Sequence, residues 1–561
     1  MKKLSYIMAT ILLFCTVLHA ATYKDNNNLD HDIILKNIAR NLPGYVDINA
    51  QGTLSKRLLE PNKTGEQQRK KIYGDIETIG ATILMPTKGY GFKPTRAYGN
   101  DTVIQPFEFI KEDPNYKYNS AKATFNFRQE TGNASIDEYA QNNVEGKNVI
   151  FARLYWGGGI SLGWNTPDTE EMRKKYFDNI NQFNQITFGT PKPEGVEGMD
   201  YHRLQAEERD TRWYGSFSAY GMQFTYQTSV DVTDLVKKSL GRKNSQRTFS
   251  AGDIRASNWK PTNFYGYRDN GWVSGLFAPH YGGWALVIVY DFEDKGASDG
   301  LKPKGVYVYD GLTVLAPIHL RGQQSRIDSL EVPFSGFFTP ASGKVNSSLT
   351  VLSFGAKAEV DKENIEILNS QGQYNSVTSP NYNQFESQFN STITRFDKPM
   401  VAHKIYNNQM DLDIYNLKGH ISNRQTSTTI KLTAQVVTRP GGGVMGEREN
   451  IGLVAFATEL YEPEVCYIEK LQVRDRTKDT EDAFKDVSTD KNTQTVAKEG
   501  DTLRVQLIVK NRGNEDAEKV ALSALIDKKS ASYTENSTYL RPSVPRNSNF
   551  EVSSSDQIND N

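Results

Sequence analysis

Cysteine and net charge are both scarce in this chain, and each scarcity excludes a class of protein. Only two cysteines occur among 561 residues, Cys15 and Cys466. Cys15 lies in a segment that we expect to be removed, so Cys466 cannot form an internal disulfide. Lys and Arg total 66 against 67 Asp and Glu, a net charge of −1. Such a balance provides no long-range field to recruit nucleic acid or anionic lipid.

Histidine is also sparse, and no two histidines have the spacing of a zinc site. Seven occur, none in an H-E-x-x-H motif, and His19 lies in the segment expected to be removed. The others are isolated: His31, His202, His280, His319, His403 and His420. We therefore expect ordinary loop or core histidines, with no metal ligand, no cofactor and no catalytic residue. A Ser-His-Asp or paired-carboxylate site assembled from distant loops remains an open alternative.

The longest apolar run lies at the N-terminus. Lys2 and Lys3 precede apolar residues 7–18, which end before Ala20 and Ala21. This is the pattern of a signal peptide, and the run is too short to span a bilayer. We expect cleavage after residue 20, no transmembrane segment afterwards, and an extracellular or cell-surface location, with the periplasm as an alternative.

Aromatic residues are abundant on a polar background, which favours sheets with one buried face. The chain holds 29 Tyr, 26 Phe and 6 Trp, with a mean hydropathy of −0.60. Strands are predicted at 148–156, at 284–290, where both faces are apolar, and at 429–438. Residues 305–315 predict a hairpin that turns at Asp310-Gly311. One helix is predicted at 167–183.

These patterns predict a mainly β protein. The signal peptide (1–20) precedes an N-terminal tether with a short helix (21–75) and a β-rich head domain (76–463). The head is expected to be a large antiparallel β-sandwich, jelly-roll-like, with two packed sheets. Residues 464–561 predict an incomplete immunoglobulin-like β-sandwich module, with alternating strands at 503–509 and 520–526 and a disordered tail after Tyr539.

Residues 499–526 (EGDTLRVQLIVKNRGNEDAEKVALSALI) resemble the opening of the conserved-repeat, immunoglobulin-like modules of bacterial surface proteins. Upstream, the chain resembles the large β-rich domain that precedes such repeats in exported, adhesin-like proteins. The pieces that carry this resemblance are 153–158, 230–234, 282–290, 309–312, 336–340 and 389–393. The resemblance implies a surface or secreted location and a binding or structural role.

Three local patterns are candidates for chemistry. Residues 159–163 (GISLG) fit the G-x-S-x-G elbow of hydrolases, but Pro167 delays any helix that would complete it, so we favour a glycine-rich strand end. Asp411 and Asp413 alternate along an extended segment, as calcium ligands would, and we favour an edge strand with outward charges instead.

An aromatic, glycine-rich stretch between Trp259 and Trp284 is the third candidate. Its aromatics fit a surface for stacking on sugars or anchoring a protein, and we favour instead a loop that folds back to cover the sandwich end, although any ligand is expected to bind here. The ligand-binding residues predicted here are Trp259, Tyr265, Tyr267 and Trp272.

The sequence thus predicts an exported adhesin-like binding or structural protein that is not an enzyme. The ligand, a glycan or a protein, is not identified by the sequence. The alternatives are a secreted hydrolase and a carbohydrate-binding module on a jelly-roll scaffold.

Overall fold

The computed structural model of the chain describes its β-rich parts, in two units. The described residues are 44–46, 54–57, 71–86, 107–127, 134–161, 182–193, 196–218, 221–257, 281–293, 301–316, 328–356, 363–400, 409–438, 444–446, 449–461, 465–475, 477, 483–487, 497–511 and 531–532. Within these residues, no helix has the length and apolarity needed to cross a bilayer. The units are Met1–Glu462 and Pro463–Asn561.

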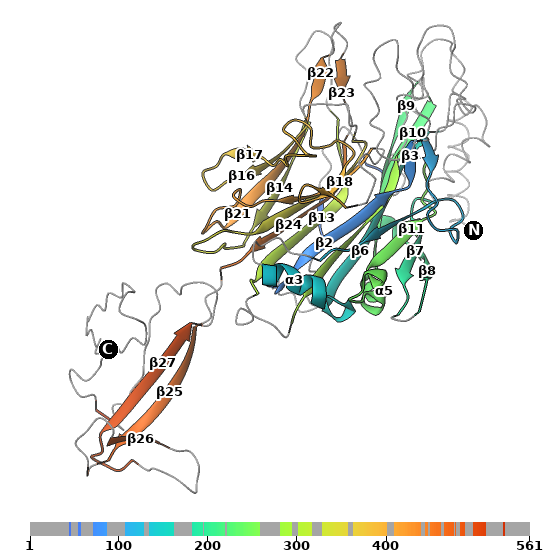
Figure 1. Cartoon of the computed structure of the whole chain (residues 1–561). Coiled ribbons are helices and arrows are strands. Elements are labelled where there is room, and N and C mark those ends of the chain that lie inside the picture. Colours follow the sequence, from blue (N-terminus) through green and yellow to red (C-terminus); the bar gives the residue numbers. More distant parts are fainter. Residues whose placement is uncertain are drawn as a thin grey trace, which may run out of the picture. The chain divides into compact units, whose positions relative to one another are not determined.

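The first unit is mainly β, as the sequence predicts, and is built around a five-stranded and a seven-stranded sheet (Figure 1). The five-stranded sheet has the order β2 (Gly74–Thr82), β12 (Gly282–Asp291), β6 (Val149–Ser161), β10 (Gly221–Asp231) and β9 (Thr211–Ser218). The seven-stranded sheet has the order β1 (Ser55–Lys56), β13 (Lys304–Leu315), β24 (Glu449–Glu459), β15 (Ser347–Phe354), β20 (Met410–Asn416), β18 (Ile393–Arg395) and β19 (Lys398–Pro399).

A four-stranded sheet packs on the outer face of each of these two sheets. The one on the five-stranded sheet has the order β5 (Ser120–Thr124), β11 (Thr248–Gly252), β7 (Gln185–Pro191) and β8 (Met199–Gln205). The one on the seven-stranded sheet has the order β14 (Asp328–Ser335), β21 (Ser427–Ala434), β16 (Glu363–Leu368) and β17 (Tyr374–Ser376). The described sheets therefore stack in four layers, whereas two were predicted.

Short elements complete the first unit. Helices α3 (Ala134–Asn143) and α5 (Thr233–Ser239) contribute Ala140 and Val236, respectively, to the core beneath the five-stranded sheet. Two-stranded ladders join β3 (Leu84–Pro86) to β4 (Phe107–Phe109) and β22 (Val436–Thr438) to β23 (Val444–Gly446). Single 3₁₀ turns are η1 (Gly146–Asn148), η2 (Glu208–Asp210) and η3 (Asn244–Gln246).

Strand β12 shows why the two inner sheets pack so closely. Every residue of β12 is buried, and it lies between β2 and β6, as predicted for an apolar run of this kind. Leu286 and Ile288 belong to the core shared with the outer sheet. Ala285, Val287 and Val289 lie on the opposite face, in the core shared with the seven-stranded sheet. These smaller side chains face others of similar size there, such as Val308 and Ala455.

The predicted hairpin at Asp310-Gly311 is wrong. Residues 304–315 form one strand, β13, which pairs with β24 along its length. The pairing register shifts between Asp310 and Thr313, so the Asp-Gly pair forms a β-bulge instead of a turn. Gly311 has a positive φ of 149°, which accommodates that irregularity.

Two other segments differ from their predictions. Strand β6 continues through Gly157 to Ser161 because β10 pairs with it as far as Ser161 and β12 as far as Gly158. A Cβ on Gly157 would lie 2.7 Å from the Tyr226 carbonyl oxygen, so the glycine permits close pairing. In the predicted tether, residues 44–46 and 54–57 belong to the first unit, and β1 pairs with β13. The predicted helix at 167–183 lies outside the described residues, apart from residues 182 and 183.

The described part of the second unit is a three-stranded antiparallel sheet. Its order is β26 (Phe484–Asp486), β25 (Val465–Arg474) and β27 (Leu503–Asn511). The alternating strand predicted at 503–509 is confirmed as β27, and its predicted return at 520–526 lies outside the described residues.

Candidate functional site

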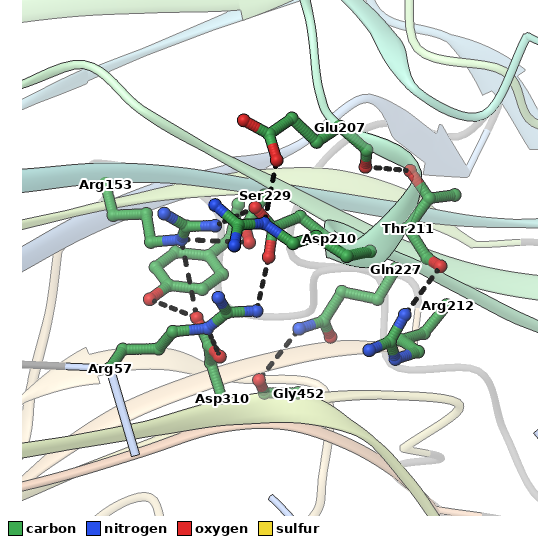
Figure 2. Close-up of polar contacts among 12 residues, drawn as sticks. Arg57, Arg153, Glu207, Asp210, Thr211, Arg212, Gln227, Ser229, Asp310 and Gly452 are labelled. Carbon is green, nitrogen blue, oxygen red and sulfur yellow. Dashed lines mark hydrogen bonds and ion pairs between the residues drawn. The ribbon is translucent and has the colours of Figure 1, made fainter. Parts of the chain in front are cut away.

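A cluster of paired charges lies between the five-stranded and seven-stranded sheets. Figure 2 shows two arginines, Arg57 and Arg153, directed toward two aspartates, Asp210 and Asp310. The cluster carries two positive and two negative charges. We refer to these four residues as the four-charge cluster.

Each member comes from a different element, so the fold alone brings them together. Arg153 lies on β6 and faces the seven-stranded sheet beside Tyr155, while Asp210 ends η2 just before β9. Asp310 lies at the bulge of β13, and Arg57 directly follows β1. Oppositely charged side chains therefore pair across the boundary between the two inner sheets.

The contacts within the four-charge cluster are short and shared. Arg57 Nη2 lies 2.5 Å from Asp210 Oδ1, and its Nε also donates to Asp310 Oδ1. Arg153 Nη2 lies 2.8 Å from Asp210 Oδ2, and its Nε lies 3.5 Å from Asp310 Oδ2. Tyr155 donates its hydroxyl to Asp310 Oδ2 at 3.0 Å, and Arg153 Nε donates to Ser229 Oγ at 3.0 Å.

The burial of these side chains determines whether the cluster can take part in acid-base chemistry. The side chains of Asp310, Asp210 and Arg153 are 1%, 8% and 9% exposed. Burial raises the pKa of Asp310, although both arginines and Tyr155 oppose that shift. Burial also raises the pKa of Tyr155 well above its usual range. With its carboxylates enclosed and paired, the cluster fits a structural link between sheets better than acid-base chemistry.

A second set of ion pairs crosses the same boundary, from Asp75 and Glu77 of β2. Lys304 of β13 pairs with Asp75, and Arg395 of β18 forms a bidentate pair with Glu77. Burial raises the pKa of Glu77 to about 7, against the opposing effect of Arg395. These contacts again join the five-stranded sheet to the seven-stranded sheet.

The predicted edge strand at Asp411 and Asp413 is wrong. Strand β20 lies inside the seven-stranded sheet between β15 and β18, and both carboxyl groups are almost fully buried. The reason is that residues 390–394, which lead into β18 beside β20, supply hydrogen-bond donors to them. Asp411 Oδ2 accepts hydrogen bonds from the backbone N–H groups of Asn390 (2.9 Å) and Thr392 (3.1 Å). Asp413 Oδ1 accepts from the N–H of Thr394 at 3.1 Å.

The electrostatics of this pair follow from its burial. Burial, reinforced by the neighbouring carboxyl of Asp413, raises the pKa of Asp411 well above its usual range. Burial raises the pKa of Asp413 to about 6, opposed by hydrogen bonds from groups that include Thr394. No group of three or more Asp, Glu, His or Cys in the described ranges is arranged to hold a metal ion.

The residues predicted to bind a ligand are not placed by the structure. Trp259, Tyr265, Tyr267 and Trp272 all lie outside the described residues. Tyr281, at the end of the same stretch, is buried and donates its hydroxyl to Thr225 Oγ1 at 2.6 Å.

The remaining predicted candidates are dispersed. Ser161 is the last residue of β6 and pairs with Gln223, so it continues a strand at the position where an elbow would turn. His202 Nε2 lies 3.1 Å from Thr190 Oγ1, and burial lowers the pKa of His420. His31, His280, His319 and His403 lie outside the described residues.

The second unit exposes apolar side chains on one face of its sheet. Leu471 pairs with Val505 and Tyr467 with Val509, which places these four on the same face. Tyr467 is 68% exposed, and Leu471 and Val505 are about 40% exposed. We refer to this set as the apolar strand face.

Sequence reasoning missed the four-charge cluster because its members are distant in sequence. Asp310 and Arg153 are the members with a local signal, since each is the charged residue that interrupts a predicted strand, at 305–315 and at 148–156. A carboxylate at such a position needs a partner inside the fold. No pattern around Arg57 or Asp210 identifies either as that partner.

Comparisons of the chain with protein-family models, curated proteins and solved structures found no match.

Proposed function

We propose that the protein is an exported, adhesin-like binding or structural protein of the bacterial surface and not an enzyme. The observation that carries this proposal is the enclosed four-charge cluster. Its two arginines and two aspartates pair with one another and link two sheets, which fits a structural role better than catalysis. The N-terminal signal pattern and the family resemblance support export.

Two surfaces support a binding role. The aromatic stretch that holds Trp259 and Trp272 has the composition of a ligand-contacting loop. The apolar strand face exposes Tyr467, Leu471 and Val505, and contiguous apolar surface of this kind is typical of contact sites. The layered first unit then acts as a rigid support for loops.

A binding experiment tests the proposal. The mature chain from residue 21 is screened against immobilised glycans and matrix proteins, alongside a variant in which Trp259, Tyr265, Tyr267 and Trp272 are all replaced by Ala. Tyr118→Ala is the matched control, because Tyr118 is 57% exposed on another loop. We expect binding by the native chain and the control, and a loss of at least about tenfold in the aromatic variant, or about 1.4 kcal/mol.

Two outcomes would contradict the proposal. One is turnover of a glycan or ester substrate that Ser161→Ala abolishes, which would support the hydrolase alternative. The other is retention in the cytoplasm of a reporter fused to residues 1–40, since the proposal requires export.

A further inference from the structure

One lysine is buried at the boundary between the two inner sheets. Lys304 is 6% exposed, and it is the only buried lysine among the residues that the structure describes. Lysine is rarely buried, because removing its ammonium group from water is costly. Lys304 Nζ contacts Oδ2 of Asp75, which is 9% exposed. An amine and a carboxyl group are therefore held in contact at a place that water hardly reaches.

The backbone fixes both residues in this position. Lys304 begins β13 and exchanges two backbone hydrogen bonds with Ile72, donating its N–H at 2.8 Å and accepting at its carbonyl at 3.1 Å. Asp75 is the second residue of β2, which pairs with β12 along its length. Asp75 Oδ1 accepts the N–H of Ile76 at 2.9 Å, while Oδ2 accepts from Lys304. Backbone pairing on both strands therefore holds the two side chains together.

A second carboxyl group lies beside this pair. Glu77 follows Asp75 by two positions on β2, so both side chains project from the same face of the strand. Burial raises the pKa of Glu77 to about 7, although the paired guanidinium of Arg395 opposes that shift. The charges of Asp75 and Lys304 also act on this pKa, so the three groups are close enough to interact. A carboxyl group with a pKa near 7 can both accept and donate a proton at physiological pH.

We propose that Lys304 and Asp75 become joined by an amide bond between their side chains. Nζ of Lys304 attacks Cγ of Asp75, a new N–C bond forms, and one C–O bond of the carboxyl group breaks. The ammonium group gives up two protons and the carboxylate gives up one oxygen, so the leaving molecule is water. Glu77 relays a proton from the nitrogen to the departing oxygen. The step needs no oxidant and no other reactant.

The charge balance of the site favours this reaction. Before it, two buried cations, Lys304 and Arg395, face two buried anions, Asp75 and Glu77. Afterwards one ion pair remains balanced, and a neutral amide has replaced the other pair together with its desolvation cost. The cations of the four-charge cluster are arginines, whose guanidinium groups stay protonated and are not nucleophiles. Lys304 is therefore the group at this boundary that can react.

The amide supplies a covalent link that the cysteine content of the chain does not provide. It joins β2 of the five-stranded sheet to β13 of the seven-stranded sheet. An amide, unlike a disulfide, is not broken by thiols, so the link is independent of the redox state of the surroundings. This inference concerns the chain itself and does not depend on the proposed function.

Intact-mass spectrometry of the chain from residue 21 tests the proposal. We expect the native chain to be lighter than its sequence requires by one molecule of water. Lys304→Arg keeps the positive charge and removes the amine, so its mass should equal that of its sequence. Lys302→Arg is the matched control, because Lys302 lies nearby and pairs with Glu459 at 3.5 Å, and it should still show the loss of water.

Tryptic peptide mapping of the native chain locates the bond. Residues 72–88 should be recovered joined to the peptide that contains Lys304, and fragmentation should place the link at Asp75. This map decides the proposal without any variant, so it holds even where a variant fails to fold. A native chain of full mass would overturn the proposal, as would a loss of water without this branched peptide.

Two variants of Glu77 test its part in the reaction. Glu77→Gln removes the proton relay and should slow linking by about a hundredfold, so this variant should be isolated mostly unlinked. Glu77→Asp retains a carboxyl group and should be isolated linked, which separates proton transfer from a purely structural effect. Full linking of Glu77→Gln would overturn the role of Glu77, and absence of the link in both variants would show that Glu77 acts only through the fold.

Discussion

Replacing Asp310 with Asn tests whether the four-charge cluster holds the inner sheets together. The change keeps the size of the side chain and removes one negative charge. Asp310 accepts hydrogen bonds from Arg57 and Tyr155 and forms an ion pair with Arg153, so the variant leaves two arginines facing Asp210 alone. The cluster then carries an uncompensated positive charge at a site that water hardly reaches.

The expected cost follows from that imbalance. Removing one partner of a buried ion pair costs about 3–5 kcal/mol, because the remaining charge stays desolvated. Asp310 has three partners and is 1% exposed, so we expect the upper part of that range. Adding Arg153→Met to Asp310→Asn restores charge balance between Arg57 and Asp210. The double variant should therefore cost less than the sum of the single variants by about 1–3 kcal/mol.

Urea unfolding followed by tryptophan fluorescence measures these free energies. All six tryptophans lie in the first unit, and Trp156, Trp213 and Trp284 are fully buried there. Asp200→Asn is the control, because Asp200 is exposed on β8, and it should leave the unfolding curve unchanged. A cost below about 1 kcal/mol for Asp310→Asn, or strict additivity in the double variant, would refute a structural role for the cluster.

Four further predictions concern other parts of the chain. Leu286→Ala should lower the free energy of unfolding by about 2–5 kcal/mol, because it empties space in a fully buried strand, and an unchanged melting temperature would contradict the central position of β12. The pKa of Asp413 is raised in the folded chain, so its protonation stabilises the fold below about pH 6 and that contribution is lost as the pH rises. Asp413→Asn should therefore show a larger stability deficit at pH 5 than at pH 7.5 by urea unfolding, and an equal deficit at both would count against the raised pKa. A calcium chelator should leave the melting curve unchanged, since Asp411 and Asp413 already accept hydrogen bonds, whereas a fall that Asp413→Asn abolishes would reveal a calcium site. Replacing Tyr467 and Leu471 with Ser should reduce binding of a hydrophobic dye and leave the tryptophan signal unchanged, and undiminished dye binding would place the exposed apolar surface elsewhere.

The sequence predicts strands well where one local pattern determines the outcome. Residues 284–290 are apolar on both faces, and only a strand covered on both sides accommodates that pattern. Strand β27 alternates, and one side of it is apolar. In both cases the information lies within about ten residues, so periodicity is sufficient to identify the strand.

Long-range pairing is what the sequence does not reveal. Asp310-Gly311 has the composition of a hairpin turn, yet β24 pairs with both sides of it and makes it a bulge. Asp411 and Asp413 have the alternation of an edge strand, yet residues 390–394 cover them and donate hydrogen bonds. In each case the surroundings of the aspartate depend on a segment distant in sequence or on a loop with no periodic pattern. The candidate site was missed for the same reason.

The interleaving of the two inner sheets also determines when this chain can fold. Tyr73 donates its N–H to Asp291, a residue 218 positions away, and Glu77 pairs with Arg395, which is 318 positions away. Strand β13 forms its long ladder with β24, so this pairing cannot be completed until the chain has been synthesised as far as Glu459. A chain that emerges N-terminus first therefore cannot complete the seven-stranded sheet until nearly the whole first unit has been synthesised, whereas the five-stranded sheet has all its strands once β12 ends at Asp291. Such non-local topologies fold slowly, and their apolar strands are exposed to aggregation while they wait.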